Sequence, residues 1–344
     1  MTAVTTNSDA AGDLAEVRDL VAPGLMATVR RLNPTMRRVV GFHCGWWDEN
    51  GAELTGSAGK SVRPTLTVRC AEAVGGNAEQ AVGAAMAVEL VHNFSLLHDD
   101  VMDGDLTRRH RPTAWSMFGM PTAILAGDAV LTLATEVLTT SYPAPLATEA
   151  VRRLSACVLR LIDGQTDDVA FERRTDVTLA ECLEMAGAKT GALLGCACEL
   201  GALVGGAGAT RVARLRQYGE HLGLAFQLAD DLLGIWGEPE VTGKPVRADL
   251  RTRKKSLPVV AALTAGSTDA ERLARLYHRP GPLVEAELPE VAALVESAGG
   301  RRWAEQRAAY ELEAALTCLR AADAEPVAAA RLVSLGRLLT RRDR

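Results

Sequence analysis

The sequence contains few aromatic residues and no paired-cysteine motif. Aromatic residues make up 4% of its 344 positions, which is low for a β-sandwich and typical of a helical protein packed with Ala, Leu and Val. The 7 cysteines are an odd number without a C-x-x-C pair, so we expect no disulfide framework and a reducing, cytoplasmic environment. Cys196 and Cys198 are expected to face the core or a neighbouring helix.

Targeting and membrane signals are also missing. The N-terminal segment lacks a basic region followed by an apolar one, so it does not indicate a signal peptide. Apolar runs stay below the roughly 18–20 residues that span a bilayer, so no stable membrane insertion is expected. The formal net charge of −5 argues against nucleic acid as a partner through bulk electrostatics.

Motifs for nucleotide binding and for covalent catalysis are absent. The chain has neither a G-x-x-x-x-G-K-[ST] loop nor a G-x-G-x-x-G loop, so nucleotide-binding folds have no support. It also lacks a G-x-S-x-G elbow and a Cys/His pair that would indicate a protein nucleophile. Electrophilic chemistry on a bound substrate fits these absences.

Helical periodicity fills most of the sequence. Thr178–Glu181 and Thr268–Glu271 have the spacing of capping boxes. Because strand-like alternation is nearly absent, we predict an all-α protein with a disordered tail at residues 1–12 and one large domain at residues 13–344. The helical patterns lie at 79–103, 121–140, 146–172, 178–203, 209–236, 255–265, 269–278, 302–322 and 326–340.

The stretch from Ser95 to His110 is rich in opposed charge. On a helix, Asp99 and Asp103 lie on the same face, and Asp100 is about 100° away, close enough to share a cation. Carboxylates this close repel one another unless a counter-charge is present, and Mg²⁺ binds carboxylate oxygens together with water and phosphate oxygens. The pattern indicates a metal–diphosphate site, and a solvated helix end is the alternative for this motif taken alone.

A second acidic pair, Asp230 and Asp231, closes another long apolar helix pattern. An all-α domain can direct two such helix ends toward one cavity, with ions held between them. Two helices that both bury acidic ends are hard to explain as solvated surfaces. We therefore expect the two motifs to serve one site.

Basic residues follow or precede both acidic motifs. Each basic cluster alone has the composition of a solvated face, but together they indicate a site for two diphosphates, one bound through metal and one bound directly. Metal and basic groups would stabilise a diphosphate leaving group, and apolar walls would shelter the resulting carbocation. The residues concerned are Lys60, Arg63, Arg108, Arg109, Lys189 with Thr190, Lys244, Lys254 and Lys255.

The motifs GKSVRP, HNFSLLHDDVMD with RR, GQTDD, KTG, FQLADD and GK…D…K occur in this order. From about residue 25 to its C-terminus the chain resembles the trans-isoprenyl diphosphate synthases, or polyprenyl synthetases. The resemblance implies a large helical bundle of the isoprenoid synthase type, usually a homodimer, with a central cavity between the aspartate-bearing helices. It implies a head-to-tail condensation: an allylic diphosphate ionises, the isopentenyl double bond attacks the cation, and a proton is lost to the departing diphosphate.

The resemblance also implies roles for individual residues. Several Mg²⁺ ions would be bound by Asp99, Asp100, Asp103, Asp230 and Asp231. Isopentenyl diphosphate would be held by Lys60, Arg63, His92 and Arg109. The allylic partner, which is dimethylallyl, geranyl or farnesyl diphosphate, would be held by Arg108, Lys189, Thr190, Gln227, Lys244 and Lys254. The catalytic set implied is Asp99, Asp100, Asp103, Lys189, Asp230 and Lys244.

Two positions depart from the family pattern. Gly234 stands where the second aspartate motif usually ends in a third aspartate, and its loss is expected to weaken the support of an ion without abolishing binding. Ser61 stands where many relatives carry an arginine. His92 keeps the pattern: it lies two helical turns before Asp99 on the same face, which favours a ligand role over that of a core histidine.

Product length is expected to depend on residues about one turn before Asp99, because the family elongates its product along this helix. Phe94 and Ser95 place one aromatic and one small side chain there, and the aspartate motif has no insertion. A C20 product, geranylgeranyl diphosphate, is therefore favoured over C15 farnesyl diphosphate. The alternative for Phe94 is packing against a neighbouring helix.

Two other functions stay open. A class I terpene cyclase would need the metal site but not the isopentenyl diphosphate residues, and Gly234 is compatible with it. A non-catalytic subunit that modulates a synthase would not need the first aspartate motif, which is intact here. The C-terminal TRRDR is expected to be a solvated tail.

Overall fold

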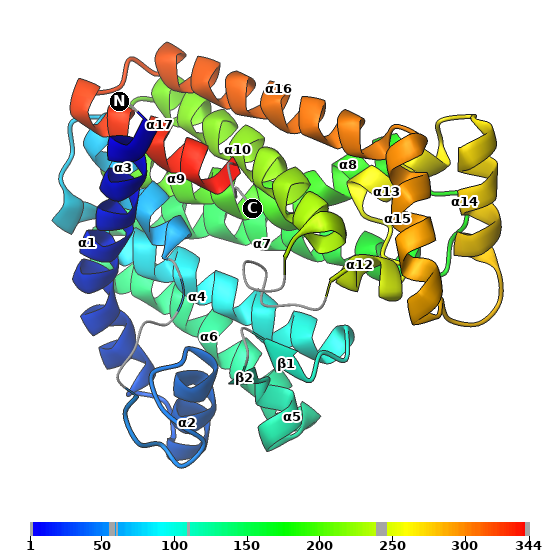
Figure 1. The fold of residues 1–344 in the computed structure, drawn as a ribbon. Helices are drawn as coiled ribbons and strands as arrows, with labels where there is room; N and C mark the ends of the chain where they lie inside the picture. Colours follow the sequence, from blue (N-terminus) through cyan, green and yellow to red (C-terminus); the bar gives the residue numbers. More distant parts are fainter. Residues whose placement is uncertain (1–2, 55–58, 60, 109–110, 239–245, 341–344) are drawn as a thin grey trace. The chain divides into compact units, whose positions relative to one another are not determined.

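A computed structural model describes residues 3–54, 59, 61–108, 111–238 and 246–340 (Figure 1). The described chain is helical apart from loops and one short antiparallel hairpin, which confirms the all-α prediction. Its elements are α1 (Ala3–Val29), α2 (Pro34–His43), α3 (Val62–Ala73), α4 (Ala78–Met102), β1 (Thr107–Arg108), β2 (Arg111–Pro112), α5 (Ala114–Phe118), α6 (Met120–Ser141), α7 (Ala144–Phe171), α8 (Leu179–Ala186), the π-turn η1 (Gly187–Gly191), α9 (Ala192–Val204), α10 (Ala209–Trp236), α12 (Ala248–Arg251), α13 (Leu257–Leu263), α14 (Thr268–His278), the 3₁₀ turn η2 (Glu285–Glu287), α15 (Leu288–Ser297), α16 (Gly300–Ala321) and α17 (Pro326–Thr340).

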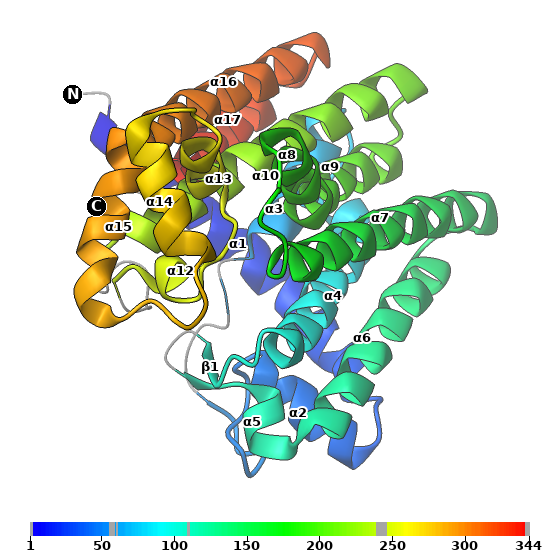
Figure 2. The same cartoon turned by 90° about the vertical axis from the view of Figure 1, so that its right-hand side faces the viewer.

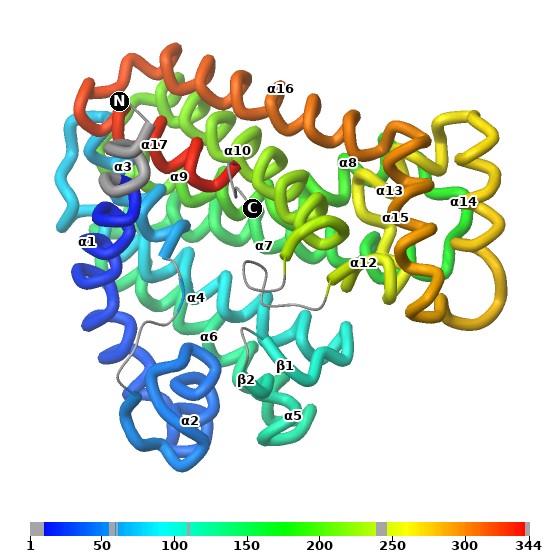
Figure 3. The backbone as a smooth tube through the Cα atoms, in the orientation of Figure 1, coloured from blue at the N-terminus to red at the C-terminus, as the bar shows by residue number. Residues whose placement is uncertain are grey.

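The chain divides into two compact units, each assembled from separate stretches of sequence. Unit 1 comprises Met1–Val158, Cys196–Arg216 and Leu319–Ser334. Unit 2 comprises Leu159–Gly195, Gln217–Cys318 and Leu335–Arg344. The divisions fall inside α7, α9, α10, α16 and α17, which can be followed along the trace in Figure 3. The single domain predicted from the sequence stays a prediction.

In unit 1, α4 packs against α6, as Figures 1 and 2 show. Glycines keep these two helices close at both ends of the contact. A Cβ on Gly83 of α4 would lie 2.5 Å from the Ser141 side chain, and a Cβ on Gly127 of α6 would lie 2.2 Å from the ring of His98. This close packing fixes the line of α4, whose C-terminal end carries the first aspartate motif.

A buried arginine joins α1 to α3 in the same unit. Arg69 is fully buried, and its guanidinium lies 2.8 Å from Asp13 of α1 and 2.9 Å from Glu72. A buried charge is costly unless it is paired, so this contact holds α1 in one position along α3. Ala10 is buried as well, so packed residues begin inside the segment 1–12, and disorder of the residues before Ala10 stays a prediction.

In unit 2, the C-terminal part of α10 contributes to two hydrophobic clusters. Leu228 packs with buried residues of α7, α8 and α13. Ile235 packs with buried residues of α12, α13, α14 and α15, the group of short helices in yellow and orange in Figure 2. Asp230 and Asp231 lie between these two anchors on α10, so apolar burial on both sides positions the second aspartate motif.

The helices of the structure lie largely where the hydrophobic periodicity of the sequence predicts them. The predicted helix 178–203 is interrupted by η1, which separates α8 from α9. The capping box of Thr178 and Glu181 is confirmed. The one predicted at Thr268 is wrong, because the preceding Ser267 is the N-cap and accepts the N–H of Ala270 at 3.2 Å.

Within the described part of the chain, two helices are long and apolar enough to cross a membrane by length and composition alone, α6 and the run Leu179–Val204. Their apolar windows are 44% and 67% buried inside the protein. Core helices pass the same test, so it does not identify a membrane span. Cys196 and Cys198 lie in the second run and are buried, as predicted, and the described residues, which include all 7 cysteines, form no disulfide bond.

Candidate functional site

The first aspartate motif closes α4. Asp99 and Asp100 lie in its last turn, and Asp103 is the C-cap, whose N–H donates to the carbonyl of Asp99 at 2.8 Å. Asp100 is 1% exposed, whereas Asp99 is half-buried and Asp103 is exposed. The three carboxylates thus lie at different depths, with Asp100 the deepest.

A short hairpin after α4 brings an arginine to Asp100. In this hairpin Arg108 of β1 pairs with Arg111 of β2, and Trp115 fixes its base by donating from Nε1 to the carbonyl of Asp105 at 2.8 Å. Arg108 Nε donates to Asp100 Oδ1 at 2.6 Å. Both residues were predicted as site residues, but their direct pairing was not.

The environment of Asp100 favours a cation. Burial raises the pKa of this carboxyl, Arg108 opposes the shift, and the charges of Asp105 and Asp103 raise it further. The second oxygen, Oδ2, is buried and has no hydrogen-bond partner among the residues that the structure describes. A buried oxygen without a donor costs free energy. A hard divalent cation would remove that cost, so the donor set fits Mg²⁺.

Within the described ranges, no group of three or more His, Cys, Asp or Glu side chains is arranged to hold a metal ion. The aspartates therefore do not form a closed cage. Mg²⁺ is usually bound through one or two carboxylates, with water and substrate phosphates as its other ligands. An open arrangement of this kind suits an ion that is completed by a diphosphate.

The segment before α3 holds two residues in left-handed backbone. Gly59 has a φ of 67° and Ser61, the N-cap of α3, has a φ of 50°. For a residue with a side chain this conformation costs roughly 1–2 kcal/mol, and such strain is common at functional sites. Arg63 lies half-buried in the first turn of α3. Lys60 and Arg109 lie outside the described residues.

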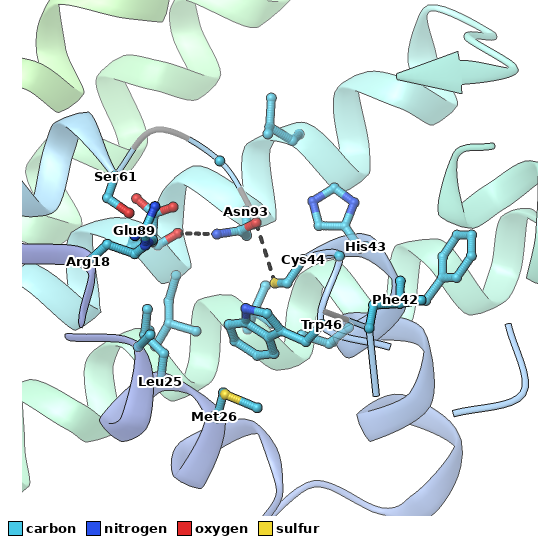
Figure 4. A pocket seen from close by; sticks show the side chains of 18 of the residues that line it. Arg18, Leu25, Met26, Phe42, His43, Cys44, Trp46, Ser61, Glu89 and Asn93 are labelled. Carbon is cyan, nitrogen blue, oxygen red and sulfur yellow. Dashed lines mark hydrogen bonds between the residues drawn. The ribbon is translucent and has the colours of Figure 1, made fainter. Parts of the chain in front are cut away.

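A cavity of about 710 Å³ lies in unit 1 among α1, α2, α4 and the hairpin (Figure 4). Leu25 and Met26 of α1 belong to its apolar wall, and Asp100 and Arg108 line it too. Gly59 and Ser61, which precede α3, also line it. Its volume is that of a small-molecule site, for which roughly 300–1,000 Å³ is usual.

The predicted chain-length residues lie on α4. Phe94 is buried, and its ring packs edge-on against His98 with the centroids 4.8 Å apart. Ser95 is half-buried and donates to the carbonyl of His92, itself half-buried, at 2.9 Å. Neither Phe94 nor Ser95 is among the described residues that line the cavity of Figure 4. Their effect on product length stays a prediction.

In unit 2, glycines bring η1, which carries Lys189 and Thr190, close to α7 and α10. A Cβ on Gly164 would lie 2.5 Å from the backbone nitrogen of Lys189, and a Cβ on Gly223 would lie 2.6 Å from the Cα of Gly191. Any larger residue would push the π-turn away. Turns of this type are frequent at functional sites.

Lys189 has an acidic partner that the sequence analysis did not name. Its Nζ donates to Asp168 Oδ2 of α7 at 2.5 Å, and both side chains remain about one-fifth exposed, at 23% and 18%. Asp168 belongs to the GQTDD motif of the sequence, but no role was predicted for this residue. The pair orients the ammonium while leaving part of it accessible to an anion.

A chain of hydrogen bonds connects η1 with the start of α13. Thr190 Oγ1 donates to Gln227 Oε1 at 2.7 Å, and Gln227 Nε2 donates to Asp231 Oδ1 at 2.8 Å. Asp231 Oδ2 accepts the N–H of Leu257 at 2.9 Å. Asp231 is therefore buried, and both of its carboxylate oxygens accept hydrogen bonds from the protein. Asp230, in contrast, is exposed.

A lysine, Lys254, lies beside Asp231 and affects its pKa. Burial raises the pKa of Asp231 to about 6, although Lys254, with its Nζ 4.0 Å away, opposes the shift. Burial works against the charged form of Lys254, but Asp249 and Asp231 raise the pKa of this lysine above its ordinary value. Lys254 thus stays positively charged. Lys255 is buried, and Lys244 lies outside the described residues.

Most of the chain is similar to known proteins. The polyprenyl synthetase family model matches residues 45–295. The chain is 50% identical over 298 residues to a (2E,6E)-farnesyl diphosphate synthase of Mycobacterium tuberculosis, which covers 86% of this chain and 83% of that protein. It is 44% identical over 330 residues to a geranylgeranyl diphosphate synthase of the same species, which covers 96% of this chain and 93% of that protein.

Solved structures share the fold. The crystal structure of a polyprenyl synthetase from Streptomyces coelicolor superposes with a TM-score of 0.91 at 48% identity, covering 95% of this chain and 98% of that one. A geranylgeranyl pyrophosphate synthase from Corynebacterium glutamicum, complexed with isoprenyl diphosphate and magnesium, superposes with a TM-score of 0.76 at 25% identity, covering 98% of each chain. The helical architecture agrees with these matches.

Proposed function

Since this chain belongs to the polyprenyl synthetase family and is a prenyltransferase, we propose that it joins isopentenyl diphosphate head to tail to allylic diphosphates and releases geranylgeranyl diphosphate. The observation that carries the proposal is the ion pair of the buried Asp100 with the half-buried Arg108 on the wall of a cavity that also has apolar lining. A carboxylate oxygen that has no donor among the described residues, beside a guanidinium, offers a cation site next to a phosphate site. A departing diphosphate needs both.

Mg²⁺ would be held by the carboxylates of the two aspartate motifs. When bound, it neutralises the charge that develops on a diphosphate leaving group. Asp100 offers the oxygen for which the described ranges hold no donor, and Asp230 offers an exposed carboxylate. Asp231 would contribute mainly by orienting Gln227. The full set proposed is Asp99, Asp100, Asp103, Asp230 and Asp231, for several ions.

Basic and polar side chains would hold the two diphosphates. Lys189 and Lys254 each have a carboxylate neighbour, which orients the ammonium group. A phosphate oxygen can then approach without a reorganisation of the lysine. The residues proposed for isopentenyl diphosphate are Lys60, Arg63, His92 and Arg109. Those proposed for the allylic diphosphate are Arg108, Lys189, Thr190, Gln227, Lys244 and Lys254.

The reaction would need positioning and shelter rather than a protein nucleophile. The allylic C–O bond breaks and its electron pair leaves with the diphosphate. The isopentenyl double bond then forms the new C–C bond, and the departing diphosphate takes the proton. Apolar side chains such as Leu25, Met26 and Leu90 would keep water away from the cation.

A C20 product is proposed over C15 because Ser95 is small and stands beside Phe94 about one turn before Asp99. The relative named as a geranylgeranyl diphosphate synthase matches 96% of this chain. The relative named as a farnesyl diphosphate synthase is more similar in identity, at 50%. Farnesyl diphosphate is therefore the alternative product.

A homodimer in the cytoplasm is proposed as the working form. Three large apolar side chains near the start of α6, Met120, Ile124 and Leu125, are exposed. A second copy of the chain would cover them and remove apolar surface from water. Neither nucleic acid nor a membrane is expected as a partner.

A product assay tests the function. The purified protein with Mg²⁺ and isopentenyl diphosphate is given dimethylallyl, geranyl or farnesyl diphosphate, and the prenyl products are sized by chromatography. C20 diphosphate is the expected product. Accumulation at C15 would leave the condensation standing and overturn the chain-length proposal. A cyclic hydrocarbon made without isopentenyl diphosphate would replace the proposal with a class I terpene cyclase.

Variants sharpen the chain-length test. Phe94→Ala should lengthen the product beyond C20, because it removes an aromatic ring near the aspartates. Phe171→Ala is a matched control, since Phe171 is equally buried but lies in unit 2. That control should lower stability without a change in product length. Unchanged product length in Phe94→Ala would mean that this ring serves only packing.

A further inference from the structure

Unit 2 contains a buried lysine that forms no ion pair with any residue that the structure describes. Lys255 lies just before α13 and is only 7% exposed. Its ammonium lies 5.3 Å from the centre of the Tyr277 ring on α14, a cation–π contact. Buried charges are almost always paired, because they lose water without compensation otherwise. Lys255 therefore lacks the partner that such a position usually requires.

Two more nitrogen atoms of this region, Arg253 Nε and His278 Nε2, are buried without a hydrogen-bond partner in the described chain. The rest of the Arg253 guanidinium is used at the C-terminal end of α14. There Nη1 donates to the carbonyl of Arg279 at 2.8 Å, and Nη2 donates to the carbonyl of Gly281. These bonds explain why a guanidinium lies at a helix C-terminus. They leave Arg253 Nε and the ring of His278 unexplained.

The three basic side chains lie close enough to act on one another. Burial lowers the pKa of His278, and Lys255 and Arg253 lower it further. The contacts give the reason: Lys255 lies over Tyr277, the residue before His278, and Arg253 binds the carbonyl of the residue after it. α13 and α14 are in contact within unit 2, as Figure 2 shows. Positive charge therefore accumulates at one place, beside the end of α14.

The carboxylates that act on this cluster do not neutralise it. Glu172, the residue after α7, favours the charged form of Lys255, but it is exposed and forms no ion pair with it. Glu287, on which Arg253 acts, is already paired with Arg279. An anion from solution would supply the missing charge, and its oxygen atoms would accept N–H groups from all three basic side chains.

We propose that Arg253, Lys255 and His278 form a binding site for a small oxyanion that carries a phosphate group. Its two sources would be free inorganic phosphate and the inorganic diphosphate that the proposed condensation releases. The site differs from the proposed substrate site, because the neighbouring Lys254 directs its ammonium toward Asp231, 4.0 Å away. A bound anion would tie the segment that carries Lys254 to α14, and it would stabilise the folded protein by mass action.

The test titrates the full-length protein with inorganic phosphate or diphosphate and follows the histidine rings by NMR. The chain has 6 histidines, and the signal of His278 is the one that disappears in His278→Gln. Either anion should shift this signal until it saturates, and should move the titration of the ring to higher pH, because an anion favours the imidazolium. Sodium chloride at the same ionic strength is the reference.

Two variants separate a specific site from general surface charge. Lys255→Met should weaken the anion-dependent shift of the His278 signal at least about tenfold, which corresponds to the loss of one charged hydrogen bond. This variant should fold, since methionine keeps the packing on Tyr277 and removes an unpaired buried charge. Arg275→Met is the matched control, because Arg275 is exposed and lies on α14 one turn before His278. It should bind the anion as the parent does.

The outcomes are distinct. If both anions move the His278 signal no more than chloride does, the inference is wrong and the basic cluster serves only to cap α14. If the two variants weaken binding equally, a specific site is refuted as well. Saturation at lower concentrations of diphosphate than of phosphate supports the site with the released diphosphate as its ligand, and the reverse supports it with free phosphate. These readouts need no turnover, so a failure of the proposed condensation would be seen separately in the product assay.

Discussion

Removal of the guanidinium beside Asp100 should move the acid limit of activity to higher pH. Burial already raises the pKa of Asp100, and Arg108 is the charge that opposes this shift. In Arg108→Gln, therefore, the carboxyl would hold its proton to a higher pH. A protonated carboxyl is a poor ligand for a cation, so Mg²⁺-dependent diphosphate binding should be lost earlier as the pH falls.

The size of this effect follows from the contact. Arg108 Nε lies 2.6 Å from Asp100 Oδ1, and the arginine side chain is 29% exposed. An opposite charge in direct contact lowers the pKa of a carboxyl, so the acid limit of the variant should lie at a clearly higher pH than that of the parent enzyme. The assay is the pH profile of kcat/KM together with Mg²⁺ titrations at two pH values.

The same hairpin supplies the control for this experiment. Arg111→Gln removes a guanidinium that stacks over Phe42 and donates to the carbonyl of Trp47 rather than to Asp100. Its acid limit should stay at the pH of the parent enzyme. If Arg108→Gln lowers the rate equally at every pH, then Arg108 acts on the substrate alone and the electrostatic argument for Asp100 is refuted.

Three further predictions concern stability. Arg69→Met should cost about 3 kcal/mol in urea unfolding, the low end for a broken buried ion pair, because the buried Asp13 would keep only the more distant Arg331, at 3.4 Å, as its partner among the described residues; a smaller loss would show that Arg331 takes over the charge of Asp13. His221→Gln should lower the free energy of unfolding by about 1 kcal/mol near pH 5.5 and by little near pH 8.5. Glu311 raises the pKa of His221, so their ion pair stabilises the fold below that pKa, and this stabilisation is lost as the pH rises through it. Thermal unfolding at both pH values checks this. Gly223→Ala should lower the free energy of unfolding by about 1–3 kcal/mol and weaken the binding of a diphosphate, because its Cβ would collide with η1. Unchanged diphosphate binding would show that the close packing of α10 on η1 does not position the site.

The helices could be predicted from sequence because periodicity reports burial directly. The window 79–103 corresponds to α4, at Ala78–Met102, and 209–236 corresponds to α10. The π-turn η1 could not be predicted in the same way, since it arises where Gly164 and Gly223 let neighbouring helices press against it. A tertiary contact, not local propensity, changes the hydrogen-bonding pattern there.

The residue types of the site could also be predicted, because the chemistry of diphosphates requires carboxylates and cations in any fold. Their partners could not. Nothing in the spacing of Thr190, Gln227 and Asp231 indicates that they form one chain of hydrogen bonds that ends at the N–H of Leu257. This chain of hydrogen bonds depends on how η1, α10 and α13 pack. The same packing determines that Asp231 is buried and that Asp230 is accessible.

The departure at Gly234 illustrates why a motif is better judged by position in space than by residue identity. From the sequence, glycine in place of the third aspartate predicts weaker support for an ion. In the structure, the space that glycine leaves is occupied by a carboxylate fifteen residues further along the chain, Asp249. The sequence shows Asp249 only as the aspartate of the GK…D…K motif; its contact with Gly234 depends on left-handed backbone at Arg247 and Arg253, two residues whose type does not favour it. The contact can therefore be recognised only where the folded backbone brings the two positions together.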